Sequence, residues 1–281
     1  MNTVLKTDDL RREFGRLVAV DGVSLEINDG EITSIIGPNG AGKTTFYNLL
    51  TGRLDPTSGT VQLQTRDDES LVDITDDSPN RIANLGLSRG FQINNVFEGL
   101  TVLQNIRIAR ISRDDRTLDF TAVTTDDAEL ADGAWDIIEL MQLEDVAKTD
   151  CANLSHGDKR KVEIGLALGT DPSVVLLDEP TAGMNANETD RMVELIGRLD
   201  RETDTTFVLT EHDMEVVIGI SDRILVLDSG NLIADGAPEA VLSDERVREA
   251  YLGLDEDEEL DADIGGSNAT PPETDDGGET A

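Results

Sequence analysis

The first 90 residues alternate short apolar runs with turn-forming residues. Val23–Ile27 has the alternating pattern of a half-buried strand, and Glu31–Ile36 is a second strand-like stretch. Asn28–Gly30 between them predicts a hairpin turn, and Pro56–Gly59 predicts a turn that leads into a strand at Thr60–Leu63. We therefore expect the chain to begin with short strands joined by tight turns.

Helical signals follow in the middle of the chain. Residues 78–85 open with Ser-Pro, which is typical of an N-cap followed by proline at the first helical position. Thr101–Gln104 has the spacing of a capping box, and Ala134–Leu143 repeats apolar residues with helical spacing. The polar, acidic stretch Ser112–Glu129 predicts a loop between these last two helices.

Strands and helices alternate again from Val174 onward. The predicted elements are the strand Val174–Leu177, a helix from about Glu188 to Leu199, the strand Thr206–Thr210, the helix Met214–Ile220 and the strand Arg223–Leu227. This order predicts an α/β fold with a doubly wound, largely parallel sheet. We expect the mostly helical residues 95–153 to be a subdomain inserted into one domain that spans residues 1–254. Residues 255–281 lack aromatic residues and periodicity, and we expect this acidic tail to be disordered.

Composition limits the classes of protein that fit the chain. No apolar run approaches the roughly 20 residues of a membrane-spanning helix, and the N-terminus lacks the apolar segment of a signal peptide. We therefore expect the chain to stay in the cytoplasm. Its single cysteine, Cys151, excludes an intrachain disulfide and a cysteine-rich metal site, and we expect it to be a small buried apolar residue.

The net charge of −36 is the most unusual bulk property of the chain. A nucleic-acid-binding protein needs the opposite balance on its contact face, so we expect no nucleic-acid partner. Self-repulsion of this size destabilises a compact fold unless salt screens it. An acidic tail alone is an insufficient explanation, because residues 1–254 still carry a net charge of −25. We therefore predict a halophilic cytoplasm, with an ordinary acidic protein as the alternative.

Residues 37–45 read Gly-Pro-Asn-Gly-Ala-Gly-Lys-Thr-Thr, which matches the phosphate-binding loop G-x-x-x-x-G-K-S/T between a strand and a helix. The glycines let backbone N–H groups surround a β-phosphate, and the helix N-terminus adds partial positive charge. Lys43 is placed to reach the β- and γ-phosphates, and the Thr44 hydroxyl to join a Mg²⁺ shell. A glycine-rich segment can be a simple turn, but here all four fixed positions are filled. The predicted ATP-binding residues are Gly37, Pro38, Asn39, Gly40, Ala41, Gly42, Lys43, Thr44 and Thr45.

The buried strand Val174–Leu177 ends in two carboxylates, Asp178 and Glu179. An apolar strand that ends in acids is common by itself, but this one follows a phosphate-binding lysine in the same chain. We interpret Asp178 as a ligand of Mg²⁺ and Glu179 as the residue that positions or deprotonates the attacking water. A metal and a positioned water are what hydrolysis of a γ-phosphate requires.

Leu154–Asp158 reads Leu-Ser-His-Gly-Asp at the start of a predicted helix. Ser155 alone is consistent with a helix N-cap. Combined with the phosphate loop and with Asp178 about 20 residues later, the segment resembles the LSGGQ signature of ATP-binding cassette (ABC) transporter ATPases. His156 stands where glycine is common in that signature, and we do not expect it to be catalytic.

The remaining marks of that family occur in order, and the resemblance covers roughly residues 3–254. Phe14 resembles the aromatic residue that stacks on adenine, Gln92 the Q-loop glutamine, residues 181–185 the D-loop and His212 the switch histidine. Phe14 alone could be a core or turn residue, and Gln92 a polar strand end. The resemblance implies a P-loop ATPase fold with an N-terminal antiparallel β subdomain and with two nucleotides held between two ATPase subunits. It implies the catalytic residues Glu179, His212 and Gln92, the Mg²⁺ ligands Thr44, Gln92 and Asp178, a signature facing the partner's ATP (Leu154, Ser155, His156, Gly157 and Asp158) and a D-loop (Ala182, Gly183, Met184 and Asn185).

Several segments resemble one branch of this family, the ATPases of branched-chain amino acid importers, and within it the larger, LivG-type subunit. They are Phe14–Asp21, Gly90–Gln92 with Leu100–Ile106, Thr181–Asn185 and Ile220–Gly236. The resemblance implies an ATPase that uses ATP and Mg²⁺ to energise uptake of branched-chain or other hydrophobic amino acids. It implies as partners a sister ABC ATPase in a hetero- or homodimer, two membrane permeases and an external solute-binding protein. The chain would then be peripheral on the inner face of the cell membrane.

Three alternatives remain at this point. Leu-Ser-His-Gly also occurs in importers of urea and short-chain amides, so the solute is open. A soluble ABC ATPase without a transport role would normally carry two cassettes or a long coiled-coil insertion, which the sequence does not contain. An exporter ATPase is disfavoured by the segments that resemble importers.

Overall fold

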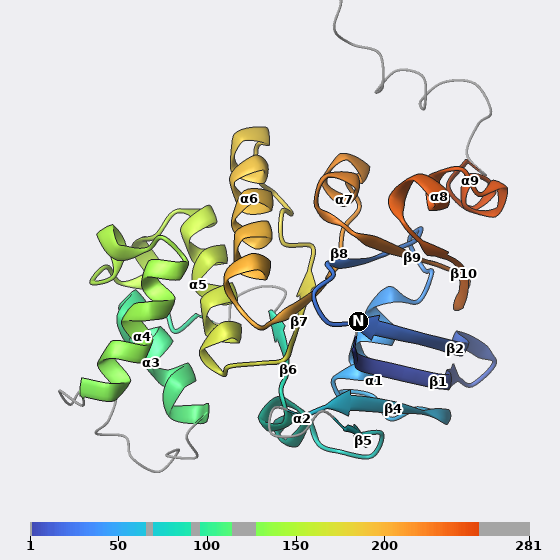
Figure 1. Ribbon diagram of the computed structural model, residues 1–281, viewed down its shortest axis with the longest axis horizontal. Helices are drawn as coiled ribbons and strands as arrows, with labels where there is room; N and C mark the ends of the chain where they lie inside the picture. Colours follow the sequence, from blue (N-terminus) through green and yellow to red (C-terminus); the bar gives the residue numbers. More distant parts are fainter. Residues whose placement is uncertain (1, 66–69, 91–95, 114–127, 253–281) are drawn as a thin grey trace, which may run out of the picture.

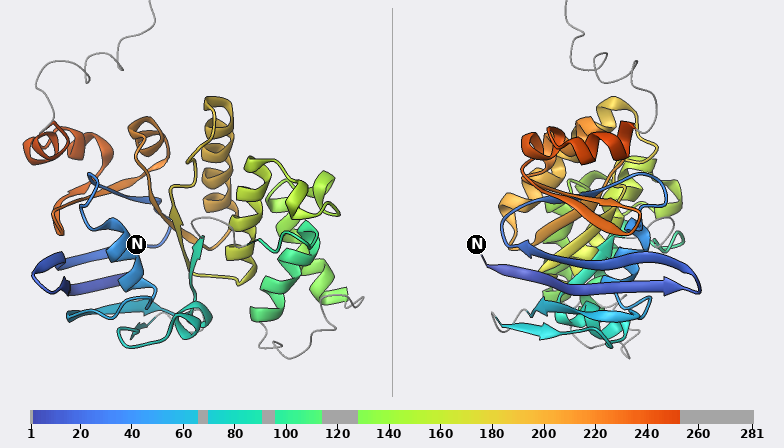
Figure 2. Two further views of the ribbon diagram at one scale, coloured as in Figure 1. Left: turned by 180° about the vertical axis from the view of Figure 1, so that it is seen from behind. Right: turned by 90° about the vertical axis from the view of Figure 1, so that its right-hand side faces the viewer.

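The computed structural model describes residues 2–65, 70–90, 96–113 and 128–252 (Figure 1). Its main elements, in chain order, are β1 (Thr3–Phe14), β2 (Leu17–Asn28), β3 (Thr33–Ile36), α1 (Lys43–Leu50), β4 (Ser58–Gln64), β5 (Leu71–Asp73), α2 (Pro79–Leu85), β6 (Leu87–Gly90), α3 (Val102–Arg113), α4 (Ala128–Leu140), α5 (His156–Gly169), β7 (Val174–Asp178), α6 (Ala186–Glu202), β8 (Thr206–Thr210), α7 (Met214–Ile220), β9 (Arg223–Asp228), β10 (Asn231–Gly236), α8 (Pro238–Leu242) and α9 (Glu245–Leu252). Helices α3 and α4 lie at one end of the molecule, and the turn between β1 and β2 lies at the other (Figure 1, Figure 2).

The first sheet has four antiparallel strands in the order β2-β1-β4-β5. The long strands β1 and β2 place Leu5 opposite Ile27 and Leu10 opposite Val23, and all four side chains are buried. These side chains pack with helix α1 in one apolar cluster. The predicted N-terminal antiparallel sheet is therefore confirmed.

The second sheet has six strands in the order β10-β9-β3-β8-β7-β6, and only the edge strand β10 runs antiparallel among the described strands. Strands β3, β7 and β8 are buried at every position, as in a sheet that helices cover on both faces. Helix α1 packs on one face, between the two sheets, while α5 and α6 pack on the other. This arrangement confirms the predicted α/β fold with a doubly wound, largely parallel sheet.

The predicted hairpin at Asn28–Gly30 is wrong. Strand β2 ends at Asn28 in the first sheet, whereas β3 begins at Thr33 in the second sheet, between β8 and β9. The apolar side chains of β3 are buried on both faces, which an exposed two-stranded hairpin could not provide. Arg223 supports the crossing, because it donates hydrogen bonds to the carboxylate of Glu31 and to the carbonyl of Glu26, both at 3.0 Å.

Capping and turn residues in the sequence predicted the bounds of several other elements correctly. Helix α2 starts at the proline and ends at Leu85, and β8 and α7 have the predicted bounds. The predicted capping box at the start of α3 is present: the Thr101 N–H donates to Gln104 Oε1 at 2.9 Å, and the Gln104 N–H donates to Thr101 Oγ1 at 3.3 Å. These signals involve neighbours in sequence, so they do not depend on the tertiary fold.

The prediction that Ser112–Glu129 forms a loop is wrong at both ends. Helix α3 continues to Arg113, and α4 begins at Ala128, before the predicted start at Ala134. Polar residues on the solvent side of an amphipathic helix do not end it, and Ser112 and Arg113, the last two residues of α3, are both exposed. Residues 114–127 and the tail 255–281 lie outside the described residues. In the part that is described, no helix is both long enough and apolar enough to cross a membrane.

Candidate active site

The phosphate loop lies between the carboxyl end of β3 and helix α1, as predicted. Two of its glycines are required by the backbone around them. A Cβ atom on Gly37 (φ +155°) would lie 2.1 Å from the carbonyl oxygen of Leu227, and one on Gly42 (φ +104°) would lie 2.3 Å from that of Ala19. The close approach of β2 and β9 to the loop therefore excludes any side chain at both positions.

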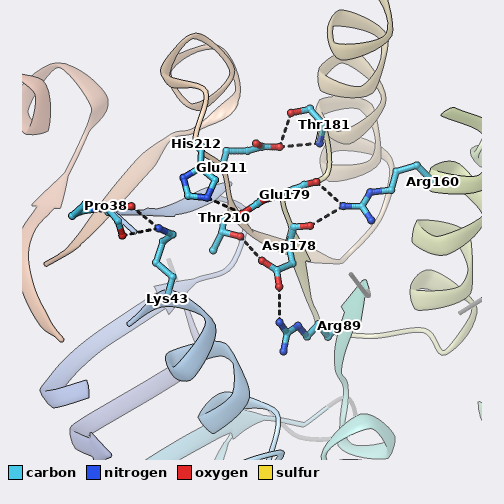
Figure 3. A network of polar contacts seen from close by, with 11 residues as sticks. Pro38, Lys43, Arg89, Arg160, Asp178, Glu179, Thr181, Thr210, Glu211 and His212 are labelled. Atoms are coloured by element: carbon cyan, nitrogen blue, oxygen red, sulfur yellow. Dashed lines mark hydrogen bonds and ion pairs between the residues drawn. The ribbon is translucent and has the colours of Figure 1, made fainter. Parts of the chain in front are cut away.

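Lys43, the first residue of α1, folds back over the loop. Its Nζ donates to the carbonyl oxygen of Pro38 at 3.2 Å and also to that of Gly37 (Figure 3). Partial burial lowers the pKa of the Lys43 ammonium, while the charges of Glu179 and Asp178 oppose that shift. Two of the three N–H donors of the ammonium are therefore engaged by carbonyl oxygens of the loop itself.

Asp178 ends strand β7 and is buried, with both carboxylate oxygens hydrogen-bonded. Oδ1 accepts from the Thr210 hydroxyl at 2.8 Å, and Oδ2 accepts from the Arg89 guanidinium at 2.5 Å. Thr210 lies directly opposite Asp178 in the β7–β8 ladder. Sequence reasoning did not identify Arg89 as a site residue, and its short strand, Leu-Ser-Arg-Gly, gives no apolar pattern from which the burial of the arginine could be predicted.

Glu179 follows Asp178 with a left-handed backbone (φ +48°), which is uncommon for a residue other than glycine. Its N–H donates to the Thr210 carbonyl at 2.9 Å, and its side chain is 30% exposed. Glu179 Oε1 lies 2.7 Å from His212 Nε2 (Figure 3). The strained backbone therefore turns this carboxylate away from the core and toward the histidine, and such strain is often found at functional sites.

Two further polar side chains, Arg160 and Glu211, hold the segments around these carboxylates, and neither was predicted from the sequence. Arg160 in α5 donates to the carbonyl oxygens of Asp178 at 2.7 Å and Glu179 at 2.6 Å. Glu211 is buried, and its Oε1 accepts from the N–H and the hydroxyl of Thr181 at 2.9 and 2.8 Å. Burial raises the pKa of Glu211, although the hydrogen bonds it accepts oppose this shift.

A cavity of about 540 Å³ collects most of the predicted site. Its lining residues come from β1–β2, the phosphate loop and the ends of β7 and β8, and they include Phe14, Asn39, Gly40, Ala41, Gly42, Lys43, Thr44, Thr45, Asp178, Glu179 and His212. Phe14 is 43% exposed, and the Arg12 guanidinium carbon lies 4.7 Å from the centroid of its ring. An exposed aromatic face at the rim of a phosphate-binding cavity is available for stacking on a nucleobase.

The signature and D-loop residues do not line this cavity. Ser155 caps α5, since its hydroxyl accepts from the Asp158 N–H at 3.1 Å, and both Ser155 and His156 are exposed. Asn185 caps α6 in a capping box with Glu188. Gln92 lies outside the described residues. The structure therefore brings the phosphate loop, Asp178, Glu179 and His212 together and leaves the signature on a separate surface.

The site can accept Mg²⁺. Thr44 and Asp178 line the same cavity and offer a hydroxyl and a carboxylate, which are hard oxygen ligands. Among the described residues there is no group of three or more His, Cys, Asp or Glu side chains that could hold a metal by themselves. Magnesium usually binds through one or two protein oxygens together with phosphate oxygens, so this donor set fits.

Comparisons with known proteins agree with this geometry. Residues 20–182 match the model of the ABC transporter family, and residues 231–257 match that of the branched-chain amino acid ATP-binding cassette transporter family. The high-affinity branched-chain amino acid transport ATP-binding protein LivG of Salmonella typhimurium is 40% identical, covering 89% of this chain and 98% of the relative.

Two solved structures share the fold over most of their length. The ADP conformation of an ATP-binding cassette of an ABC transporter has a TM-score of 0.79 and 32% identity, covering 90% of this chain and 100% of that chain. A dimeric ATP-binding cassette bound to ADP and Pi has a TM-score of 0.66 and 25% identity, covering 83% of this chain and 98% of that chain.

Proposed function

The chain belongs to the ABC transporter ATPases, and from this premise we propose that its ATP hydrolysis energises the import of branched-chain amino acids. The observation that carries the proposal is the single cavity shared by the phosphate loop, Asp178, Glu179 and His212. The match of residues 231–257 to the branched-chain family and the names of the most similar relatives support this class of solute.

The geometry supports a division of roles within the cavity. The loop and Lys43 bind the β- and γ-phosphates, and Phe14 stacks on the adenine. Thr44 and Asp178, with Gln92, would hold Mg²⁺, which when bound neutralises charge on the phosphate oxygens. Glu179 accepts a proton from the attacking water, and His212 holds that carboxylate in place through the 2.7 Å contact.

The exposed signature supports a site that is shared between two ATPase subunits. Ser155 and His156 are exposed and lie outside the chain's own cavity, so a nucleotide contact from them requires a second subunit. A cassette at 25% identity is dimeric in a solved structure bound to ADP and Pi. We propose that a sister ABC ATPase or a second copy of this chain supplies the opposite half of the site.

We further propose that two permeases anchor this dimer to the inner face of the cell membrane and that an external solute-binding protein delivers the amino acid. A second cavity, of about 490 Å³, opens between α2, β6 and α5 and is lined in part by Phe97, Leu166 and Arg89. Phe97 is 54% exposed at this cavity, so its apolar surface is available to a partner. We propose that a permease binds at this cavity.

Transport in proteoliposomes tests the function. The chain is reconstituted with its permeases, its sister ATPase and its binding protein, and uptake of radiolabelled leucine is measured with and without ATP inside the vesicles. We expect uptake that requires ATP and that is lost when the chain carries Glu179→Gln. Uptake of urea or acetamide in place of leucine would overturn the solute, and ATP-independent uptake would overturn the energising role.

A further inference from the structure

Arg89 is a buried arginine that joins three elements of the site. It lies near the end of strand β6, and only 8% of its surface is exposed. One terminal nitrogen donates to Asp178 Oδ2 at 2.5 Å (Figure 3). The other donates to Asn48 Oδ1 at 2.8 Å. Its guanidinium carbon also lies 5.4 Å from the centroid of the Tyr47 ring. Because Tyr47 and Asn48 belong to α1, Arg89 connects the helix of the phosphate loop to the strand that carries Asp178.

Arg89 reaches Asp178 from outside the cavity that holds the phosphate loop. Asp178 lines the cavity that holds the phosphate loop, whereas Arg89 does not line it and instead lines the second cavity, beside α2 and α5. Arg89 therefore cannot touch a nucleotide in that first cavity directly. Any influence that it has on the reaction must pass through the carboxylate of Asp178 or through helix α1.

The contact fixes how Asp178 is presented to a metal. The side chains of Arg89 and Asp178 are 7% and 6% exposed, so each charge is compensated by the other and not by solvent. With Thr210 bound to Oδ1 and Arg89 to Oδ2, the carboxylate has little freedom to rotate. Groups that hydrogen-bond a metal-ligating carboxylate orient it, and their loss typically weakens metal binding by about 10- to 100-fold.

We propose that Arg89 is a positioning residue of the Mg²⁺ site: it holds the Asp178 carboxylate aimed at the phosphate loop, and so sets the affinity of the nucleotide-bound protein for Mg²⁺. The inference rests on the proposed function. Arginine is required because two separate nitrogens serve Asp178 and Asn48 while the planar group faces the Tyr47 ring. Lysine would keep the charge but could not make the three contacts together.

Thermal unfolding of the whole chain in saturating ADP tests the proposal without relying on hydrolysis. Mg²⁺ is titrated into samples that begin in EDTA, and the concentration that gives half of the Mg²⁺-dependent rise in melting temperature is recorded. We expect Arg89→Gln to raise this concentration about 10- to 100-fold, with Arg89→Lys between this variant and the parent. Arg81→Gln is the matched control, since Arg81 is 65% exposed and pairs only with Asp77 in the described part of the chain, and it should behave as the parent.

The affinity for ADP in EDTA separates positioning from a general loss of structure. Positioning leaves this affinity within about threefold of the parent, because Arg89 is not part of the nucleotide cavity. A Mg²⁺ requirement equal to the parent's, or a parallel loss of ADP affinity in EDTA, would overturn the proposal. If Arg89→Gln does not fold, Arg89→Lys decides, because an unchanged Mg²⁺ requirement in that variant overturns it too. A parent chain that binds no ADP would instead contradict the proposed function.

Discussion

His212 Nε2 lies 2.7 Å from Glu179 Oε1, although 33 positions separate the two residues in the chain. The contact arises because β7 and β8 are parallel neighbours in which Asp178 pairs with Thr210. Each strand therefore delivers its next residues to the same edge of the sheet, where binding sites of open α/β sheets are found. The imidazole is 48% exposed and the carboxylate 30% exposed, so both remain accessible from the cavity.

Glu179→Gln should block hydrolysis while leaving nucleotide binding intact. The amide has nearly the same shape as the carboxylate but cannot accept the proton of the attacking water, so the hydrolysis rate should fall about 10²- to 10⁴-fold. Phosphate release and ADP binding by calorimetry are the two measurements. Glu215→Gln, a change at an exposed position in α7, is the control and should keep the parent rate. Hydrolysis at the parent rate by Glu179→Gln would exclude the catalytic role.

The same variant tests the shared site. If a second subunit clamps the nucleotide through its signature, blocked hydrolysis should trap the closed pair. Glu179→Gln should then elute from size exclusion as a dimer with Mg²⁺ and ATP and as a monomer with ADP, alone or when mixed with its sister ATPase. An inactive variant that never dimerises in either setting would contradict the shared site.

Lys43→Ala should weaken ATP binding by about 10- to 100-fold, because a hydrogen bond to a charged group contributes about 1.5–3 kcal/mol. Titration calorimetry gives the affinity. Lys148→Ala, which removes a lysine that does not line the cavity, should leave the affinity unchanged. Equal affinities for Lys43→Ala and the parent would show that the phosphate loop does not bind the phosphates as assigned.

Glu211→Gln should change how stability depends on pH. Burial raises the pKa of Glu211 above its ordinary value of 4.5, so the folded state binds a proton more tightly than the unfolded state does. The parent should therefore lose stability relative to Glu211→Gln as pH rises from 4.5 through the raised pKa, because ionising the buried carboxyl costs more in the folded state. The loss amounts to about 1.4 kcal/mol for each pH unit that separates the pKa of the folded state from that of the unfolded state. Melting temperatures of both proteins across this pH range measure the effect. A difference that is constant, or that changes in the parent's favour with rising pH, would contradict the burial argument.

Stability should rise steeply with salt. The Debye length falls from about 10 Å at 0.1 M to about 3 Å at 1 M, which screens repulsion among the excess carboxylates. We expect the melting temperature to increase over this range of KCl. A chain truncated after Leu254 should keep most of the increase, because residues 1–254 carry a net charge of −25. A flat response would contradict the halophilic prediction, and a response lost on truncation would assign it to the tail.

The sequence by itself determined the features that depend on neighbouring residues. The phosphate loop, the capping box at Thr101–Gln104 and the bounds of α2 and α7 follow from residue types at fixed short spacings. The buried strand that ends in two acids located Asp178 and Glu179, and the family resemblance located His212; the structure brings all three to one cavity. These features can be predicted from the sequence alone because the backbone geometry that they require involves only neighbouring residues.

Only the tertiary structure decided which segments meet. Strand β3 does not form the expected hairpin with β2. It lies in the interior of the second sheet, between β8 and β9, where both of its faces are buried. The tertiary structure also gave Asp178 a buried partner, Arg89, from 89 positions earlier in the chain, and gave Thr181 a partner in Glu211. No local pattern specifies these pairs, because a buried charge is satisfied by whichever opposite charge or donor the strand order brings beside it.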